Sequence, residues 1–329
     1  MKNLETLINA QQRKEGIFSR ACRFIKRKIA PAILYAGMGL SALTGFNGCG
    51  KGGGGGTPPD TTPEIICNSD ISVDYAWAMK SDGSYLTQVG TQIYTKPKWH
   101  PLDKTKIIAS RKNAGTGKYY IFTANRDGTT ETSIIDNSAS WHDYKASYKP
   151  DGTKLCFISD RDSGTLYVYT ANADGSSQTK LPNQSSGGVK ENPVWGADGY
   201  IYYETWKINN WEICRAKADG TGTEENLTNT SADEGNVDIS HNGTQIVYAS
   251  LQTGSQQLFT ANPNGTNPVQ ITFGSRAACE PNFSPNGTQI VYGEYVASPE
   301  SEDLVVIDKD GTNALSITDG ARDYFCPDW

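Results

Sequence analysis

The stretch NFSPNGTQIVYGE, residues 282–294, repeats the stretch DISHNGTQIVYAS, residues 238–250, at a distance of 44 residues. Self-similarity at a fixed interval of this length indicates a repeat architecture. Looser copies read KWHPLDKTKIIAS, SYKPDGTKLCFISD and VWGADGYIYYET, and a partial copy reads CPDW. We call the residue just before each turn the anchor. The anchors are Trp99, Tyr148, Trp195, Ile239, Phe283 and Trp329, at steps of 49, 47, 44, 44 and 46 residues.

The anchors form one ladder, by which we mean a motif that recurs at a nearly constant interval. A second ladder, made of tight turns, has the same period. It reads KSDGS, NRDGT, NADGS, KADGT, NPNGT and DKDGT. Its turn residues are Asp82, Asp127, Asp174, Asp219, Asn264 and Asp310, at steps of 45, 47, 45, 45 and 46 residues. Two ladders with one period predict six structural units.

Each unit contains four short strand patterns. The anchor strand ends in a turn such as Ser284 to Gly287, in which Pro and Gly occupy the positions that suit them. A β-branched and aromatic run follows, such as residues 289–292. A third strand closes in the Asp-Gly or Asn-Gly hairpin, and a fourth ends near a Leu-Thr or Ile-Thr pair. Four strands in about 40 to 45 residues are typical of a β-propeller blade. The sequence therefore predicts an all-β, six-bladed β-propeller over residues 63–329.

The sixth blade is expected to be shared between distant segments. Only three strand patterns precede the first anchor, at residues 64–68, 75–79 and 85–89, whereas a single anchor strand follows the last hairpin. Three strands and one strand make a complete four-stranded blade. Their pairing would close the ring and remove exposed sheet edges.

Residues 1–62 do not fit the repeat. A basic stretch, residues 20–28, precedes an apolar run at residues 29–46, which is the pattern of a secretory signal peptide over residues 1–48. Gly48 precedes Cys49, and a Gly-rich tether occupies residues 49–62. This order predicts a bacterial lipoprotein with Cys49 as the lipid attachment residue, although Phe46 and Asn47 depart from the usual lipoprotein pattern. Ordinary secretion and an uncleaved membrane anchor are the alternatives, and all three place the ring outside the cytoplasm.

Charge limits the class of partner. The chain has 30 Lys and Arg against 36 Asp and Glu; its first 49 residues contain 8 basic and 2 acidic ones, leaving 22 and 34 for the remainder. An acidic ring is a poor ligand for nucleic acid or for an anionic membrane surface. We therefore expect no nucleic-acid partner and membrane contact only through the lipid anchor.

Five cysteines follow Cys49, and two of them fall in the shared blade. Cys67 and Cys326 lie on strands that are expected to be neighbours, so a disulfide between them is one prediction for an oxidising compartment. The alternative is that all five are buried thiols that act as small hydrophobic groups.

The repeat form resembles a known family. The pattern P-x-W-S-P-D-G followed by an apolar strand appears at residues 281–287, 147–152 and 193–199. It resembles the PD40 repeats of the TolB propeller family, and the likeness covers about residues 63–329. The resemblance implies a six-bladed, non-enzymatic binding ring in the cell envelope, facing the outer membrane or the periplasm. It also implies a protein partner, such as a peptidoglycan-associated lipoprotein. TolB carries an α/β domain before its propeller, where this chain has the signal and the tether.

Motifs for catalysis are absent from the sequence. There is no G-x-S-x-G, H-E-x-x-H or C-x-x-C, and His100, His142 and His241 occupy different positions within their repeats. We therefore predict no catalytic residue, no histidine metal site and no cofactor. The alternative function is a carbohydrate-directed propeller that binds or cleaves an envelope or dietary glycan, since some related propellers are uronide lyases. A structural spacer without a ligand is a third interpretation.

Acidic residues precede most anchors by three to six positions. They are Asp143, Glu191, Glu234, Glu280 and Asp323. The connections between blades lie near the channel mouth of a propeller, so these carboxylates either hydrogen-bond between blades or converge on a ligand. Converging carboxylates would favour a cation such as calcium, or a basic peptide.

Three tryptophans are candidates for contact with a partner. Trp206 and Trp211 flank the loop KINN, and Trp141 lies in a connection between blades. Exposed aromatic side chains are frequent in protein and sugar contacts. Together these features predict a monomeric, lipid-tethered propeller that presents one face of the ring to an envelope protein.

Overall fold

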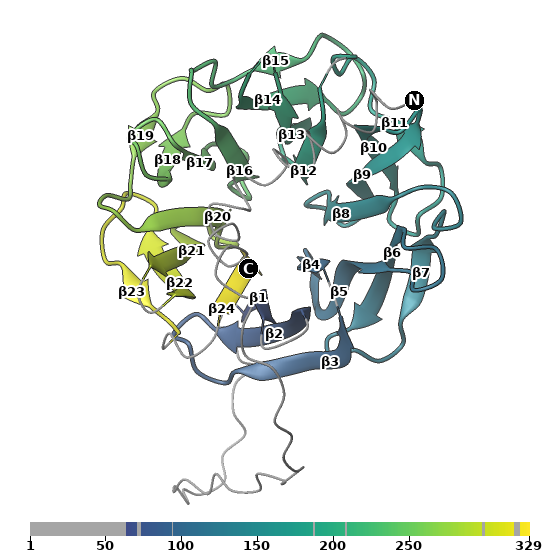
Figure 1. Ribbon diagram of the computed structural model, residues 1–329, viewed down its shortest axis with the longest axis horizontal. Coiled ribbons are helices and arrows are strands. Elements are labelled where there is room, and N and C mark those ends of the chain that lie inside the picture. Colours follow the sequence, from purple (N-terminus) through teal and green to yellow (C-terminus); the bar gives the residue numbers. More distant parts are fainter. Residues whose placement is uncertain are drawn as a thin grey trace, which may run out of the picture.

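The computed structural model describes residues 64–70, 74–93, 95–186, 188–207, 209–297, 300–318 and 323–329. These residues form six four-stranded antiparallel sheets arranged around a central axis (Figure 1). The predicted six-bladed propeller is confirmed. The predicted signal peptide, Cys49 and the tether lie outside the described residues. No helix long and apolar enough to cross a membrane occurs in the described part of the chain.

The strands follow one another blade by blade. The first blade has β24 (Asp323–Asp328), β1 (Glu64–Asp70), β2 (Asp74–Lys80) and β3 (Thr87–Ile93). The second has β4 (Thr95–His100), β5 (Asp103–Lys112), β6 (Tyr119–Asn125) and β7 (Thr132–Ile135). The third has β8 (Asp143–Tyr148), β9 (Lys154–Asp162), β10 (Thr165–Asn172) and β11 (Thr179–Lys180). The fourth has β12 (Lys190–Trp195), β13 (Tyr200–Trp206), β14 (Trp211–Lys217) and β15 (Glu225–Asn226). The fifth has β16 (Glu234–Ile239), β17 (Ile246–Ser250), β18 (Gln257–Ala261) and β19 (Val269–Gln270), and the sixth has β20 (Ala277–Phe283), β21 (Gln289–Ala297), β22 (Glu300–Asp308) and β23 (Leu315–Ser316).

The blade predicted to be shared between distant segments, counted sixth in the sequence, is the one numbered first in the structure, and it is shared as predicted. Strand β24 pairs antiparallel with β1, with Ser69 opposite Tyr324 and Asn68 opposite Phe325. Figure 1 shows β24 beside β1 at the inner end of that blade. A buried cluster at this junction combines Ile65 and Met79 with Leu304 and Trp329. The last strand therefore completes both the hydrogen bonding and the core of the first blade.

The anchor side chains pack between blades. Trp99, Trp195, Phe283 and Trp329 are all buried. Trp195 shares a cluster with Cys156 and Val168 of the preceding blade, for example. Burial of large aromatic side chains at these four junctions supplies much of the favourable free energy of such a ring.

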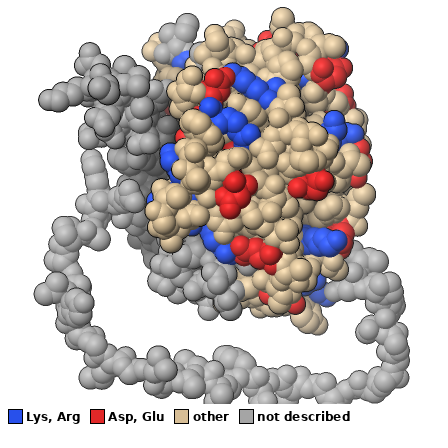
Figure 2. Space-filling model, turned by 90° about the vertical axis from the view of Figure 1, so that its right-hand side faces the viewer, with Lys and Arg blue, Asp and Glu red and all other residues tan. Residues whose placement is uncertain are grey.

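The two faces of the ring differ in the connections they carry. Each innermost strand begins at one face, which we call the mouth face, and ends at the other, which we call the turn face. The mouth face carries the hairpins between second and third strands, such as residues 113–118, and the connections between blades, such as residues 136–142. The turn face carries the Asp-Gly turns. Seen from the side, basic and acidic residues are interspersed, without a large patch of one sign in view (Figure 2).

The residue three positions after each Asp-Gly turn residue has a positive φ angle. These residues are Tyr85, Thr130, Ser177, Gly222, Asn267 and Asn313. Gly and Asn tolerate this left-handed conformation, whereas a β-branched residue is strained in it. Thr130, with φ of 53°, is the β-branched member of the set.

Replacing Thr130 by Asn is therefore expected to stabilise the protein by about 0.5 to 1 kcal/mol. Thr130 is exposed, and its hydroxyl accepts a hydrogen bond from Asn125 that an Asn side chain could also accept. The denaturant concentration at the midpoint of unfolding measures the change. The reverse substitution, Asn313→Thr, should lower stability, and an unchanged or lower midpoint for Thr130→Asn would contradict the assignment of strain.

Candidate binding site at the channel mouth

Each innermost strand contains a bulge at the same position. The residue three before each anchor has a positive φ angle, between 47° and 55°, and the pairing register shifts there or next to it. These six residues, which we call the mouth ring, are Lys96, Lys145, Asn192, Asn236, Glu280 and Cys326. A bulge re-aims side chains locally. The repeated bulge brings the mouth-ring residues together at the centre of the propeller.

The backbone of the bulge is bound by the preceding blade. The N–H of Lys96 donates to Asn68 Oδ1 at 3.1 Å, and the N–H of Lys145 donates to Ser110 Oγ at 3.0 Å. In the same way, the N–H of Cys326 donates to Glu280 Oε2 at 2.5 Å. Strained backbone persists where its surroundings hold it in place. These hydrogen bonds between blades therefore fix the direction of the mouth-ring side chains.

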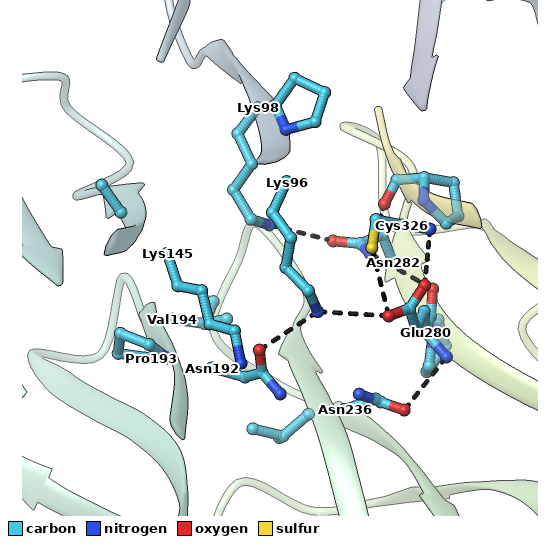
Figure 3. A pocket seen from close by; sticks show the side chains of 15 residues that line it. Lys96, Lys98, Lys145, Asn192, Pro193, Val194, Asn236, Glu280, Asn282 and Cys326 are labelled. Carbon is cyan, nitrogen blue, oxygen red and sulfur yellow. Dashed lines mark hydrogen bonds and ion pairs between the residues drawn. The ribbon is translucent and has the colours of Figure 1, made fainter. Parts of the chain in front are cut away.

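The mouth ring lines a pocket of about 510 Å³, a volume that includes open solvent. Its lining extends from the mouth ring towards the anchors, and Lys96, Lys98 and Lys145 are its basic members (Figure 3). The proline-rich wall consists of Pro97, Pro193, Pro281 and Pro327. Proline offers no N–H donor. Recognition inside the pocket therefore depends largely on the lysine and asparagine side chains.

Lys96 bridges the ring. Its ammonium group lies 3.3 Å from Glu280 Oε1 and donates to Asn192 Oδ1 at 3.1 Å (Figure 3). Glu280 also accepts hydrogen bonds from the N–H and, at 3.2 Å, the Sγ of Cys326. Glu280 thus lines the pocket and also links β20 to β24, the strand that closes the ring.

Lys98 and Lys145 line the same pocket and are paired with acids that do not line it. Lys98 Nζ lies 3.0 Å from Asp328 Oδ1, and Lys145 Nζ lies 2.5 Å from Glu191 Oε2. Burial acts to lower the pKa of Lys98, but the charges of Asp328 and Asp238 outweigh it and hold that pKa above its ordinary value. Lys98 therefore stays charged at neutral pH.

The predicted acids lie in separate environments. Asp143 is buried and pairs with Arg161 at 2.6 Å, while Glu191 binds Lys145 and the Tyr144 hydroxyl. Asp323 begins β24, and its side chain lies outside the described part of the structure. Among the acids whose side chains are described, only Glu280 lines the mouth pocket. The expected convergence of carboxylates is therefore not found there, because the acids occupy different offsets from the bulge.

The fifth acid, Glu234, is buried within its own blade. Its Oε1 accepts hydrogen bonds from Thr230 Oγ1 at 2.6 Å and Ser250 Oγ at 2.9 Å. Its Oε2 has no hydrogen-bond partner among the described residues, and burial raises the pKa of Glu234 to about 7. Within the described ranges, no group of three or more His, Cys, Asp or Glu side chains is arranged to hold a metal ion.

Glu234 is expected to make folding stability depend on pH. Its pKa is raised in the folded state, so its contribution to stability is fully present below the unfolded pKa, near 4.5, and is lost as pH rises towards 7. Relative to Glu234→Gln, the unchanged protein should lose about 2 to 3 kcal/mol between pH 5 and pH 8. Urea unfolding of both proteins at the two pH values measures this difference. An equal difference in stability between the two proteins at pH 5 and pH 8 would show that the Glu234 carboxyl titrates normally.

The three predicted contact tryptophans differ in exposure. Trp141 is 39% exposed, in the connection that precedes β8. Trp206 is half-buried and packs edge to face on Trp211, with ring centroids 5.6 Å apart. Trp211 is buried in a core cluster with Val189, so its assignment as an exposed contact residue is wrong. All three lie at the mouth face, Trp206 and Trp211 at strand ends and Trp141 in a connection between blades, and Trp141 is the one most accessible to a partner.

The predicted disulfide is absent. Cys67 and Cys326 lie on neighbouring strands, as expected, but both are buried thiols. Cys326 Sγ donates to Glu280 Oε1, and Cys67 Sγ donates to the Trp77 carbonyl at 3.7 Å. Burial raises the pKa of the Cys67 thiol, and the alternative of buried thiols acting as small hydrophobic groups describes both residues.

The three pocket lysines were not singled out by sequence reasoning. A signal was present, because Lys96 and Lys145 stand at the same offset, three residues before their anchors. Reading that single column through the six repeats would have identified the mouth ring. Which column faces the channel depends on the bulge, and nothing in the side chains of Lys, Glu or Cys predicts a left-handed residue.

Comparisons with known proteins agree with this architecture. Residues 88–273 match the PD40 family model, described as the TolB beta propeller domain. TolB from Acinetobacter baumannii is 18% identical, with a TM-score of 0.68 over 83% of this chain and 67% of that one. A putative TolB from Agrobacterium tumefaciens is 17% identical, with a TM-score of 0.59 over 80% of this chain and 96% of that one.

More distant folds include enzymes. An oligogalacturonate lyase in complex with manganese is 13% identical, with a TM-score of 0.55 over 76% of this chain and 73% of that one. No curated protein matches the sequence significantly. Identities this low show a shared fold alone, whereas the family model covers more than half of the chain. The chain belongs to the family of TolB β-propeller (PD40) domains.

Proposed function

We propose that this protein is a non-enzymatic binding ring of the bacterial cell envelope, which holds a partner protein against its mouth face. The observation that carries the proposal is the mouth pocket, where three lysines and a ring of polar side chains surround an opening of about 510 Å³. The exposed Trp141 lies on the same face and would extend the contact. Pockets that combine a few placed polar groups with neighbouring exposed aromatic residues suit recognition.

The tether is part of the proposal. A lipid on Cys49 would hold the ring at a membrane, with residues 49–62 as a flexible spacer, facing the outer membrane or the periplasm. Metabolic labelling with an alkyne-bearing fatty acid should mark the full-length protein and not its Cys49→Ser variant. Labelling of both proteins, or of neither, would argue against lipidation at Cys49 while leaving the binding ring to be tested separately.

The partner is to be sought in the native envelope. The tagged full-length protein would be crosslinked in its own cells, purified, and analysed by mass spectrometry, with Trp141→Ala as the variant. Recovery of one envelope protein in near-stoichiometric amount, reduced by Trp141→Ala, supports the proposal; a peptidoglycan-associated lipoprotein is the partner that the family resemblance suggests. Recovery of no specific protein would overturn it.

A glycan-directed function is the alternative, and the lysine-lined pocket is the observation that favours it, because uronic acids carry carboxylates. Incubation with acidic oligosaccharides and detection of new unsaturated ends would reveal lyase activity. Release of such ends by the purified protein, absent from a heat-denatured control, would replace the scaffold proposal with an enzymatic one.

A further inference from the structure

The basic side chains of the mouth pocket are concentrated on two adjacent blades. Lys96 and Lys98 come from β4, and Lys145 comes from β8, the next innermost strand. In Figure 3 the three side chains extend into the same opening. Asn192 follows on the next blade. One sector of the channel mouth is therefore rich in ammonium groups, although the chain as a whole carries a net charge of −6.

The lysine side chains are the more exposed members of their ion pairs. The three lysine side chains are 18 to 22% exposed, whereas their partners Glu280, Asp328 and Glu191 are 8 to 16% exposed. The carboxylates lie further from solvent than the lysines they bind. A ligand that enters the opening thus finds the lysine side chains more exposed than the carboxylates that they bind, in surroundings where screening by water is reduced.

Two of the lysines keep hydrogen-bonding capacity for a ligand. An ammonium group has three donors. Lys145 Nζ bonds Glu191 Oε2, and Lys98 Nζ bonds Asp328 Oδ1 and, at 3.4 Å, Asn282 Oδ1. Counting contacts among the described residues, each ammonium group thus keeps at least one donor for a ligand. Charge-assisted hydrogen bonds from such donors to a carboxylate are among the stronger polar contacts in proteins.

Glu280 shows what kind of group the pocket accepts. Its carboxylate comes from β20, two blades away from Lys96 on β4, binds Lys96, and is held in place by the N–H of Cys326. Glu280 is thus a carboxylate of the protein itself that forms an ion pair with one of the three neighbouring lysines. Lys98 and Lys145 also line the pocket, but the acids that they bind, Asp328 and Glu191, do not.

We propose that the mouth pocket binds a carboxylate group, supplied in the native complex by an acidic side chain of the partner protein that inserts into the channel. This inference rests on the proposed binding function and names the chemistry of its contact. The carboxylate bridges Lys98 and Lys145, with Glu280 as its competitor for Lys96. A free organic acid would offer the same chemistry, and the experiment separates the two sources.

The test uses the full-length protein and two small probes. The probes are the tripeptide Gly-Glu-Gly with blocked ends and its Gly-Gln-Gly counterpart, with succinate as a free acid, and affinity is measured by NMR titration. The Glu peptide is expected to bind at least tenfold more tightly than the Gln peptide. Lys145→Gln and Lys98→Gln should each weaken binding of the Glu peptide at least fivefold. Lys217→Gln, which removes the same charge from an exposed outer position, should leave that binding unchanged.

Glu280→Gln gives a prediction of opposite sign. The amide still accepts a hydrogen bond from the N–H of Cys326 but releases Lys96, so the Glu peptide should bind several-fold more tightly. Structural damage would not strengthen binding, and a melting temperature checks that every variant is folded. Equal affinity for the two peptides, or an equal effect of Lys217→Gln, would overturn the inference.

The outcome can be separated from that of the proposed function. If an envelope partner is recovered by crosslinking but Lys145→Gln leaves its yield unchanged, the partner binds elsewhere and the carboxylate inference fails alone. If succinate binds as tightly as the peptide and no protein partner is recovered, the pocket takes a free acid and the proposed protein-binding function fails.

Discussion

Removal of residues 326–329 is expected to prevent formation of the closed ring. These residues complete β24, the innermost strand of the first blade, and they include Trp329, which is buried in the closing cluster. Their loss also removes the hydrogen bonds from the Cys326 N–H to Glu280 and from the Trp99 N–H to Asp328 Oδ2. Strand β1 would become an exposed edge beside an opened core.

The size of the effect follows from these losses. Replacing a buried Trp by Ala alone typically costs about 3 to 5 kcal/mol, and an entire domain is stable by only about 5 to 15 kcal/mol. The truncated protein should therefore be largely insoluble or unfolded, as judged by circular dichroism and size-exclusion chromatography. Trp329→Ala should show a graded loss, and Trp141→Ala, at an exposed position, should show little. A truncated protein that melts at the original temperature would mean that the ring does not depend on β24.

Substitution of Gly175 by Ala is the second change with a large expected effect. Gly175 has a φ angle of 83°, and an added Cβ would lie 1.9 Å from the carbonyl oxygen of Ile134 in the neighbouring blade. Equivalent close approaches join Gly83 to Ile317, Gly265 to Leu227 and Gly311 to Ile271. The Asp-Gly ladder therefore has a role beyond turn geometry, because its glycines let adjacent blades touch through their backbones.

Gly222 is the matched control for this substitution. Its φ angle of 76° is similar, but an added Cβ would meet no atom within 4 Å. Gly222→Ala should cost about 1 kcal/mol, the conformational penalty alone, whereas Gly175→Ala should cost more than about 3 kcal/mol because the blades must also separate. Denaturant unfolding measures both. Equal losses of stability in the two variants would show that the neighbouring blade moves away from the added Cβ without a cost in free energy.

The sequence predicts the ring well because the motifs that indicate a propeller recur along the chain. Two ladders of turns and anchors, each present six times, determine strand number, blade boundaries and the sharing of the first blade. These features depend on local turn chemistry and alternating burial, which a single chain displays directly. The same repetition explains why β24 pairs with β1 as expected.

The candidate site is less accessible to sequence reasoning, and the reason is geometric. Asp143, Glu191 and Glu280 stand five, four and three residues before their anchors, and in the described structure only the last offset reaches the pocket. A bulge built from ordinary residues decides which offset faces the channel. Burial of Trp211 likewise depends on packing against Trp206 and Val189, which the sequence does not show.

Photocrosslinking from the two faces of the ring tests the binding function most directly. A benzophenone-bearing residue would replace Trp141, exposed on the mouth face, or Leu102, which is 72% exposed in the hairpin between β4 and β5 on the turn face. In native cells, irradiation should produce one discrete adduct from position 141 and none from position 102. A discrete adduct from position 102 alone, or from neither position, would contradict the assignment of the mouth face as the binding surface.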